Sequence, residues 1–367
     1  MPSHDAGPST RSIRAGVPPA EQGAPLLPGP VFAAPFHLRG DPESAPYGYG
    51  REGNPSWTHL EAALGALDGA ENVVFASGMA AVTAVLFSTL RAGDVLVACG
   101  DGYPGLRGLA SDRLAALGVR TRFAPTDTGA LCDAAEGAAL VWFETPSNPR
   151  LDLVDIAAVA EVAHAAGAIV AVDNTVATPL GQRPLDHGAD VAMLSGTKSL
   201  TGHSDVLLGA VSTRDPERAE TLRTWRTLSG AITGGFEAWL AHRSMATLGL
   251  RLERSSANAA AVAELLRGRD DVLEVMHPRG PLAERQMAFT GPLVSFTLAS
   301  AGRADAFLGA CELVVEATSF GGVHSSAERR ARWGTDDVPE GFVRFSAGCE
   351  DAADLLADVE QALDATR

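Results

Sequence analysis

Short apolar runs rich in β-branched residues recur along this chain, and several of them end abruptly in polar residues. The run 168–172 ends at Asp173, and the run 191–194 leads into Ser195 and Lys198. Such runs are typical of buried parallel strands, whose polar ends collect at the carboxyl edge of a sheet. The pattern therefore predicts that a carboxylate and a lysine arrive at one edge of a buried sheet.

These strands alternate with segments that carry apolar residues at helical spacing, which predicts a doubly wound α/β domain. The run 205–212 predicts an antiparallel or edge strand, and Ser56 is predicted to cap a helix over 56–67. The remaining predicted elements are strands at 72–76, 94–98, 119–123 and 139–143, helices at 106–117 and 215–228, and helix starts at Ser77 and Asp155.

The pattern changes in the last third of the chain. A long helix is predicted over 236–267, with a kink at Gly249. The elements predicted after it are strands at 272–277, 293–298, 313–317 and 342–346 and a final helix at 352–365. This order is typical of a smaller α+β domain. The predicted division is an extended N-terminal arm over 1–46, a large domain over 47–235 and a C-terminal α+β domain over 236–367.

The first 46 residues hold ten of the 22 prolines, which largely excludes regular helix and central strand there. Composition alone fits a disordered tail as well as an extended arm. The apolar stretch 31–36 favours an arm that docks on the rest of the molecule.

Composition and charge narrow the function classes. With 367 residues, 46% of them hydrophobic, the chain can build large buried cores. A formal net charge of −16 disfavours binding to nucleic acid and to anionic membranes. The four cysteines form no Cys-x-x-Cys pair, which argues against a disulfide framework and a zinc ribbon, and no metal is expected. Because the sequence shows no signal peptide and no apolar stretch of membrane-spanning length, a cytoplasmic protein is expected.

Asp173 and Lys198 match the two side chains that pyridoxal-phosphate chemistry needs. A lysine amine holds this cofactor as a Schiff base, and a carboxylate keeps its pyridine nitrogen protonated so that the ring accepts electrons. Lys198 is the only lysine in the chain, so no other amine side chain can replace it. Two other interpretations fail: the companion triplets of the penicillin-interactive Ser195-x-x-Lys198 pattern are absent, and Thr197 interrupts a Walker loop.

Other loops at predicted strand ends offer further candidate residues. Gly78 and Met79 open a helix directly after a strand, where backbone N–H groups and the helix dipole favour an anion. Tyr103 and Asn148 lie in loops that follow two more predicted strands. Arg344, on a strand of the small domain, can grip a carboxylate or form a structural ion pair, and both uses stay open.

Together these motifs resemble the Cys/Met-metabolism family of pyridoxal-phosphate enzymes, which includes cystathionine γ-lyases, cystathionine γ-synthases, cystathionine β-lyases and methionine γ-lyases. The resemblance runs in order over residues 10–365. It implies the type I fold of pyridoxal-phosphate-dependent transferases, with a mostly parallel seven-stranded sheet in an α/β large domain and a smaller C-terminal α+β domain. The segments that carry it are Tyr49-Gly-Arg51, Ser77-Gly-Met79, Glu144-Thr-Pro-Ser-Asn148, Asp173-Asn-Thr175 and Ser195-Gly-Thr197-Lys198.

The resemblance also implies roles for single residues. Asp173 meets the ring nitrogen, Tyr103 stacks on the ring, and Lys198 forms the aldimine; Lys198 and Tyr103 are the implied catalytic pair. The residues implied to bind the cofactor are Tyr49, Arg51, Gly78, Met79, Tyr103, Asn148, Asp173, Thr175, Ser195, Thr197 and Lys198. Those implied to bind the substrate are Asn148, Ser319 and Arg344.

Tyr49 and Arg51 are implied to reach the cofactor phosphate of a neighbouring subunit, in a homotetramer built as a dimer of dimers. From the sequence alone, the two residues also fit an ordinary surface loop. The implied partners are therefore further copies of the chain and a small sulfur amino acid as substrate, with neither nucleic acid nor membrane.

The positions expected to recognise the distal end of the substrate depart from the family pattern. Gly108 stands where cystathionine enzymes usually carry an arginine, with Arg107 one residue early, and His324 stands where they carry a glutamate. We expect His324 and Arg107 to set distal specificity, unless His324 only packs against the following loop, 325–330. The expected activity is that of a cystathionine γ-lyase, which releases cysteine, 2-oxobutanoate and ammonia. The alternatives are γ-replacement on an O-acyl-homoserine, a methionine γ-lyase, and a cofactor-binding regulator without turnover.

Overall fold

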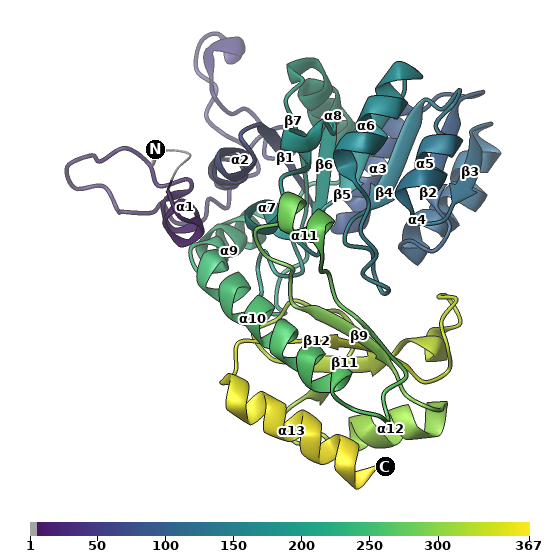
Figure 1. The fold of residues 1–367 in the computed structure, drawn as a ribbon. Helices are drawn as coiled ribbons and strands as arrows, with labels where there is room; N and C mark the ends of the chain where they lie inside the picture. The colour runs from purple at the N-terminus through teal and green to yellow at the C-terminus, as the bar shows by residue number, and fades with distance from the viewer. Residues whose placement is uncertain (1–5) are drawn as a thin grey trace.

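The computed structural model describes residues 6–367, which fold around two β-sheets (Figure 1). The larger sheet has the strand order β1-β7-β6-β5-β4-β2-β3, and the smaller sheet has the order β10-β11-β12-β9-β8. The strands of the larger sheet are β1 (Glu71–Phe75), β2 (Val95–Cys99), β3 (Arg120–Ala124), β4 (Leu140–Glu144), β5 (Ile169–Asp173), β6 (Val191–Ser195) and β7 (Gly209–Thr213). Those of the smaller sheet are β8 (Glu274–Met276), β9 (Leu293–Thr297), β10 (Val315–Glu316), β11 (Ser326–Arg329) and β12 (Phe342–Ser346).

The larger sheet is parallel except at β7, which runs antiparallel to both of its neighbours, β1 and β6. The predicted mostly parallel, seven-stranded sheet is therefore confirmed, and the strand predicted as antiparallel or edge is antiparallel and lies inside the sheet. The register places Glu144 of β4 beside Asp173 of β5, and Asp173 beside Met193 of β6. The carboxyl ends of these three central strands thus gather polar side chains at one edge.

Helices cover both faces of the larger sheet, which explains why its strands read as continuous apolar runs (Figure 1). One face packs against α3 (Gly78–Thr89), α4 (Pro104–Leu109), the π-helical turn η2 (Ala110–Leu114) and α8 (Pro216–Ser229). The other face packs against α2 (Pro55–Asp68), α5 (Thr128–Ala134), α6 (Ile156–Ala165) and α9 (Gly235–Met245). The short helices α7 (Thr178–Gly181) and η3 (Pro184–His187) follow β5.

The smaller sheet packs its core against three helices, α10 (Leu248–Arg267), α12 (Ala301–Ala310) and α13 (Ala352–Ala365) (Figure 1). Phe296 of β9 meets Phe307 of α12 edge to face, with ring centroids 5.6 Å apart. The strands pair antiparallel except for β10 with β11. The remaining helices are α1 (Pro8–Arg14), η1 (Pro42–Ser44), α11 (Pro281–Gln286) and η4 (Arg330–Trp333).

The segment after His324 was predicted as a loop, and this prediction is wrong at β11 (Ser326–Arg329). The sequence Ser-Ala-Glu-Arg has low strand propensity. The strand forms because it pairs with β10 on one side and β12 on the other, and because Glu328 is buried opposite Arg344. Tertiary contacts therefore override local propensity here.

The long helix predicted over 236–267 is two helices in the structure. α9 ends at Met245 and α10 begins at Leu248, so the break lies before the predicted kink at Gly249. Gly249 lies inside α10, where a Cβ would come 2.7 Å from the Cα of Ser9 in α1. The glycine therefore permits close packing of two helices and does not mark a kink.

Two details of the N-terminal region also differ from prediction. The arm contains the helix α1, which begins at Pro8, because proline is tolerated in the first turn of a helix. The helix α2 is capped by Asn54, whose side chain accepts a hydrogen bond from the N–H of Ser56. The Ser56 hydroxyl accepts instead from the N–H of Val31, and so fastens the arm to the large domain.

The chain passes from the larger to the smaller sheet through α9 and α10. The predicted domain boundary at residues 235 and 236 coincides with the start of α9 and stays a prediction. Within residues 6–367, no helix is both long enough and apolar enough to span a membrane.

Candidate active site

A cavity of about 350 Å³ lies between the carboxyl edge of the larger sheet and the loops of the smaller sheet. Its walls bring together residues from segments far apart in the sequence. The predicted site residues that line it are Gly78, Met79, Tyr103, Asn148, Asp173, Thr175, Ser195, Thr197, Lys198, Ser319 and Arg344.

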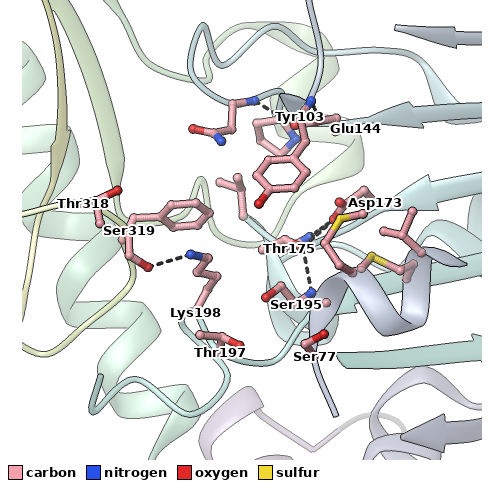
Figure 2. Close-up of a pocket in the computed structure, with 18 of the residues that line it drawn as sticks. Ser77, Tyr103, Glu144, Asp173, Thr175, Ser195, Thr197, Lys198, Thr318 and Ser319 are labelled. Atoms are coloured by element: carbon pink, nitrogen blue, oxygen red, sulfur yellow. Dashed lines mark hydrogen bonds between the residues drawn. The ribbon is translucent and has the colours of Figure 1, made fainter. Parts of the chain in front are cut away.

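Lys198 follows β6 and projects into this cavity, where its Nζ donates a hydrogen bond of 2.6 Å to the Ser319 hydroxyl (Figure 2). The Phe320 ring lies 5.0 Å from the same nitrogen. Burial, followed by the positive charge of Arg344, lowers the pKa of Lys198 to about 8. A lysine amine in this setting is available as a base or nucleophile near neutral pH.

The backbone that follows Lys198 is held by Arg251, a buried residue of α10 that the sequence analysis missed. Its guanidinium donates to the carbonyl oxygens of Ser199, at 2.6 Å, and Leu200, at 2.9 Å. A lone arginine inside a helical pattern gives no sequence signal for this contact. Arg251 thus fixes the position of the lysine loop relative to the small domain.

Asp173 ends β5 and is held by Thr175, whose backbone N–H and hydroxyl both donate to Oδ1 of the carboxylate. The Thr175 hydroxyl oxygen in turn accepts from the N–H of Ser195, at 2.8 Å (Figure 2). Burial raises the pKa of Asp173, and the Thr175 hydrogen bonds and the charge of Lys198 oppose that rise. A cationic partner at this position would stabilise the carboxylate.

Glu144 ends the neighbouring strand and accepts hydrogen bonds from the backbone N–H groups of Tyr103 and Asn148. Burial, and then the adjacent Asp173, raises the pKa of Glu144 to about 8. From the sequence, Glu144 belongs to a motif but has no predicted role of its own. Its contacts show that it positions the loops of two candidate site residues.

The first turn of α3 forms a cradle for an anion. Ser77 caps the helix by accepting a hydrogen bond from the N–H of Ala80, which leaves the N–H groups of Gly78 and Met79 at the helix N-terminus. A Cβ on Gly78 would come 2.8 Å from the Cβ of Ser195, so a larger residue would displace the next segment of the cavity wall. The cradle and Lys198 line the same cavity.

The small domain supplies a guanidinium to the opposite wall. Arg344 of β12 is 4% exposed and donates to Asn148 Oδ1 at 2.7 Å, to the carbonyl oxygen of Ser319 at 3.0 Å, and to Glu328. Burial is the main cause that lowers the pKa of Arg344 to about 10. The side chain therefore remains a cation at neutral pH and can bind a substrate carboxylate.

Four candidate residues, Tyr49, Arg51, Arg107 and His324, do not line this cavity. Arg51 lies 5.6 Å from the centroid of the Tyr49 ring and donates to the carbonyl oxygen of Thr227. His324 lines a separate cavity of about 520 Å³ that adjoins the first along the 318–320 segment. Arg107 donates to the carbonyl oxygens of Gly102 and Thr335.

An amine, a carboxylate and an anion cradle in one cavity are the groups that pyridoxal phosphate needs. Lys198 fits its aldehyde, Asp173 its pyridine nitrogen, and the N-terminus of α3 its phosphate. The site is therefore of the type found in pyridoxal-phosphate enzymes.

Comparisons with known proteins agree with this class. The sequence matches the family described as Cys/Met metabolism PLP-dependent enzyme over residues 30–364. A Streptomyces coelicolor protein provisionally named cystathionine gamma-lyase is 55% identical over 98% of this chain and 94% of its own length. Cystathionine gamma-synthase of Mycobacterium tuberculosis is 39% identical over 98% and 97% of the two chains. The crystal structure of metB from Corynebacterium glutamicum has a TM-score of 0.95 at 35% identity and covers 100% of both chains.

The chain belongs to the Cys/Met-metabolism family of pyridoxal-phosphate-dependent enzymes. The resemblance seen in the sequence, the fold class and the cofactor are thereby confirmed. The protein is an enzyme of a family that acts on sulfur amino acids, so a small-molecule substrate is established in these broad terms.

Proposed function

We propose that this enzyme is a cystathionine γ-lyase, which converts L-cystathionine and water to L-cysteine, 2-oxobutanoate and ammonia. The observation that carries the proposal is the single lysine of the chain, which shares one cavity with Tyr103, Asp173 and Arg344. The 55% identity to the Streptomyces coelicolor protein supports the choice of a lyase.

In this proposal each wall of the cavity has its own task. Asp173, with Thr175 and Ser195 behind it, holds the ring end of the cofactor, and the N-terminus of α3 holds its phosphate with Thr197 nearby. When bound, pyridoxal phosphate withdraws electrons from the α-carbon of an amino acid. Arg344 binds the α-carboxylate of the substrate, and Asn148 fixes the guanidinium.

Lys198 and Tyr103 carry out the proton transfers. The lysine amine removes the α-proton of the substrate and can return protons to carbon, because its lowered pKa leaves a large neutral fraction near pH 8. The Tyr103 phenol lines the same cavity and donates a proton to the departing sulfur. The contact between Lys198 and Ser319 keeps the amine aimed into the cavity between these events.

The nearest competing function is γ-replacement on an activated homoserine, as in a cystathionine γ-synthase. The 39% identity to the Mycobacterium tuberculosis synthase favours this alternative. Synthases and lyases need the same cofactor residues, so only the distal part of the site can separate them. A methionine γ-lyase is the third member of this group.

The proposal is tested by an end-product assay of the purified holoenzyme with cystathionine, methionine, cysteine and O-acyl-homoserines in parallel. We expect 2-oxobutanoate and cysteine from cystathionine at the highest kcat/KM. Formation of cystathionine from an O-acyl-homoserine and cysteine at a higher kcat/KM would make the enzyme a synthase. No release of a 2-oxo acid and no replacement product from any substrate would indicate a regulator without turnover.

We also propose that two subunits share each site within a homotetramer, and that the enzyme is cytoplasmic. Tyr49 is 46% exposed, and together with Arg51 it is free to meet another copy of the chain. The four cysteines are unpaired thiols, which supports a reducing compartment. Mixing inactive Arg51→Ala and Lys198→Ala subunits should restore about a quarter of wild-type activity, because each hybrid dimer regains one of two sites. No recovery after verified subunit exchange would contradict a shared site.

A further inference from the structure

A second arginine lines the cavity beside Lys198 and Arg344. Arg330 begins η4, directly after β11, and is 8% exposed. Arg330 has no role predicted from the sequence, because the segment after His324 was predicted as a loop. Its place in the wall depends on β11, which carries it to the same side of the small sheet as Arg344.

Arg330 is held in place by two carboxylates. Its Nη1 donates to Glu328 Oε1 at 2.8 Å, and its Nε and Nη2 both donate to Asp336 Oδ2, with Nε at 2.9 Å. Glu328 also accepts a hydrogen bond from Arg344 at Oε1 and one from the Trp333 indole N–H at Oε2. Both guanidiniums are therefore held by one oxygen of the same buried carboxylate, with little freedom to move.

These contacts leave some N–H donors of Arg330 unused. A guanidinium has five N–H donors, and the contacts recorded within residues 6–367 use three of those of Arg330. The two that remain belong to Nη1 and Nη2, the pair that matches the two oxygens of a carboxylate.

The surrounding charge is positive. Three carboxylates, Glu328, Asp336 and Glu316, pair with four cations in this cluster. The cations are Arg107, Arg330, Arg332 and Arg344. Arg330 also acts on Lys198 across the cavity, since its charge is among the causes, after burial, that lower the pKa of that amine. An anionic group on a ligand would offset the excess of positive charge.

We propose that Arg330 binds a second carboxylate of the substrate, so that the site takes α-amino acids whose side chain ends in a carboxylate. Arg344 then holds the α-carboxylate, and Arg330 holds the distal one on the same wall. The proposal depends on the proposed function in one respect: the ligand is an amino acid whose α-carboxylate is held by Arg344.

Arg330 is better placed for this task than the residues expected from the sequence. The donors of Arg107 go to the carbonyl oxygens of Gly102 and Thr335, and it does not line the cavity of Lys198. His324 lines the adjoining cavity. Arg330 therefore acts as the specificity-determining residue for the distal group.

Binding of two unreactive ligands to the holoenzyme tests the proposal, with calorimetry and the cofactor absorbance as readouts. L-2-aminosuberate has the chain length of cystathionine, with a methylene in place of sulfur and no distal amine, and L-2-aminooctanoate lacks its distal carboxylate. The test variant is Arg330→Gln. The matched control is Arg329→Gln, because Arg329 is the preceding residue and pairs with Asp305 and Glu340 away from the cavity.

We expect the wild type and Arg329→Gln to bind aminosuberate about tenfold more tightly than aminooctanoate, and Arg330→Gln to lose this preference. Arg330→Lys, which keeps the charge without the paired donors, should retain only part of it. Equal affinity of the wild type for both ligands, or an unchanged preference in Arg330→Gln, would overturn the proposal. If Arg330→Gln does not fold, the wild type and Arg330→Lys decide the outcome.

The same ligands separate this proposal from the proposed function. A preference that depends on Arg330, in an enzyme that does not cleave cystathionine, would refute the lyase and support the carboxylate site. Cleavage of cystathionine with no preference between the two ligands would support the lyase and refute the carboxylate site.

Discussion

The two sheets of this enzyme carry the charged residues of the candidate site in different places. In β4 and β5 of the larger sheet, the acids Glu144 and Asp173 come at the carboxyl end, after buried apolar residues. In the smaller sheet, Glu328 and Arg344 lie inside β11 and β12, directly opposite each other in the antiparallel register. The smaller sheet therefore has a buried ion pair within its own framework.

This difference matches two tasks. Strand ends lead into loops, where backbone N–H groups and side chains can adapt to a cofactor. A charge in mid-strand is fixed by the neighbouring strands, so its side chain has one position, which suits the recognition of a substrate anion. We infer that the larger sheet serves the cofactor and the smaller sheet serves substrate selection.

The largest effect is expected at Lys198, which follows β6 at the carboxyl edge of the larger sheet. Lys198→Ala should lower turnover by at least about a thousandfold, since the chain has no second lysine to replace the lost amine. The absorbance band that arises from the Schiff base between the cofactor and Lys198 should be lost in the same variant. Detection of a borohydride-reduced cofactor on any other residue, by peptide mapping, would contradict the assignment.

The apolar cores of the two sheets should respond alike. Phe143 of β4 and Phe345 of β12 are both fully buried, so Phe143→Ala and Phe345→Ala should each cost about 4 kcal/mol of unfolding free energy. Denaturant titration of the two variants checks this expectation. A loss at Phe345 much smaller than at Phe143 would mean that the ion pairs, and not the core, hold the smaller sheet together.

The lowered pKa of Lys198 gives a pH-dependent prediction. A lysine becomes nucleophilic when it loses its proton, so reductive methylation of Lys198 in cofactor-free protein should be half-maximal near pH 8, against the ordinary value of 10.5. Mass spectrometry of the Lys198 peptide reports the reaction without interference from other lysines. The urea-denatured protein is the control, and a midpoint equal to that of the denatured chain would refute the shift.

The smallest effect is expected from the ion pair of the smaller sheet. Glu328→Gln keeps the shape of the side chain but leaves Arg344 and Arg330 without their shared anion, at a cost of about 3 kcal/mol in unfolding free energy. The partly exposed Glu316, which pairs with Arg332, gives the control Glu316→Gln, with a loss below about 0.5 kcal/mol. Similar losses in both variants would remove the proposed distinction between the sheets.

The sequence predicted most of the fold, and it identified the candidate cofactor residues that line one cavity, because their signals are local. Apolar runs that end in Asp173 or Ser195 identify strands and their useful ends without knowledge of distant contacts. Glu144 and Arg251 act through partners far along the chain, and no periodicity reveals such pairs. The partners of Arg330 are close in sequence, but its place in the cavity wall depends on the pairing of β11 with β12. The strand β11 was missed for the same reason, since its buried charge is stable only beside Arg344.

The break between α9 and α10 shows a related limit. No proline lies near residues 246 and 247, and Gly249 attracted the predicted kink because it is the residue with the weakest helix propensity in that segment. Its actual use, close approach to Ser9, depends on where the N-terminal arm folds back.

The presence of one recessed lysine also has a consequence for the outside of the molecule. Apart from histidine, every other cationic side chain is arginine, so the surface offers guanidinium groups and no ε-amine. Reactions that modify surface lysines, such as acetylation, glycation and glutaraldehyde cross-linking, have the chain terminus and the active site as their amine targets. In the cofactor-free protein, acylation of this single ε-amine should therefore abolish the activity regained with cofactor, and attachment to an amine-reactive resin should proceed through the terminus.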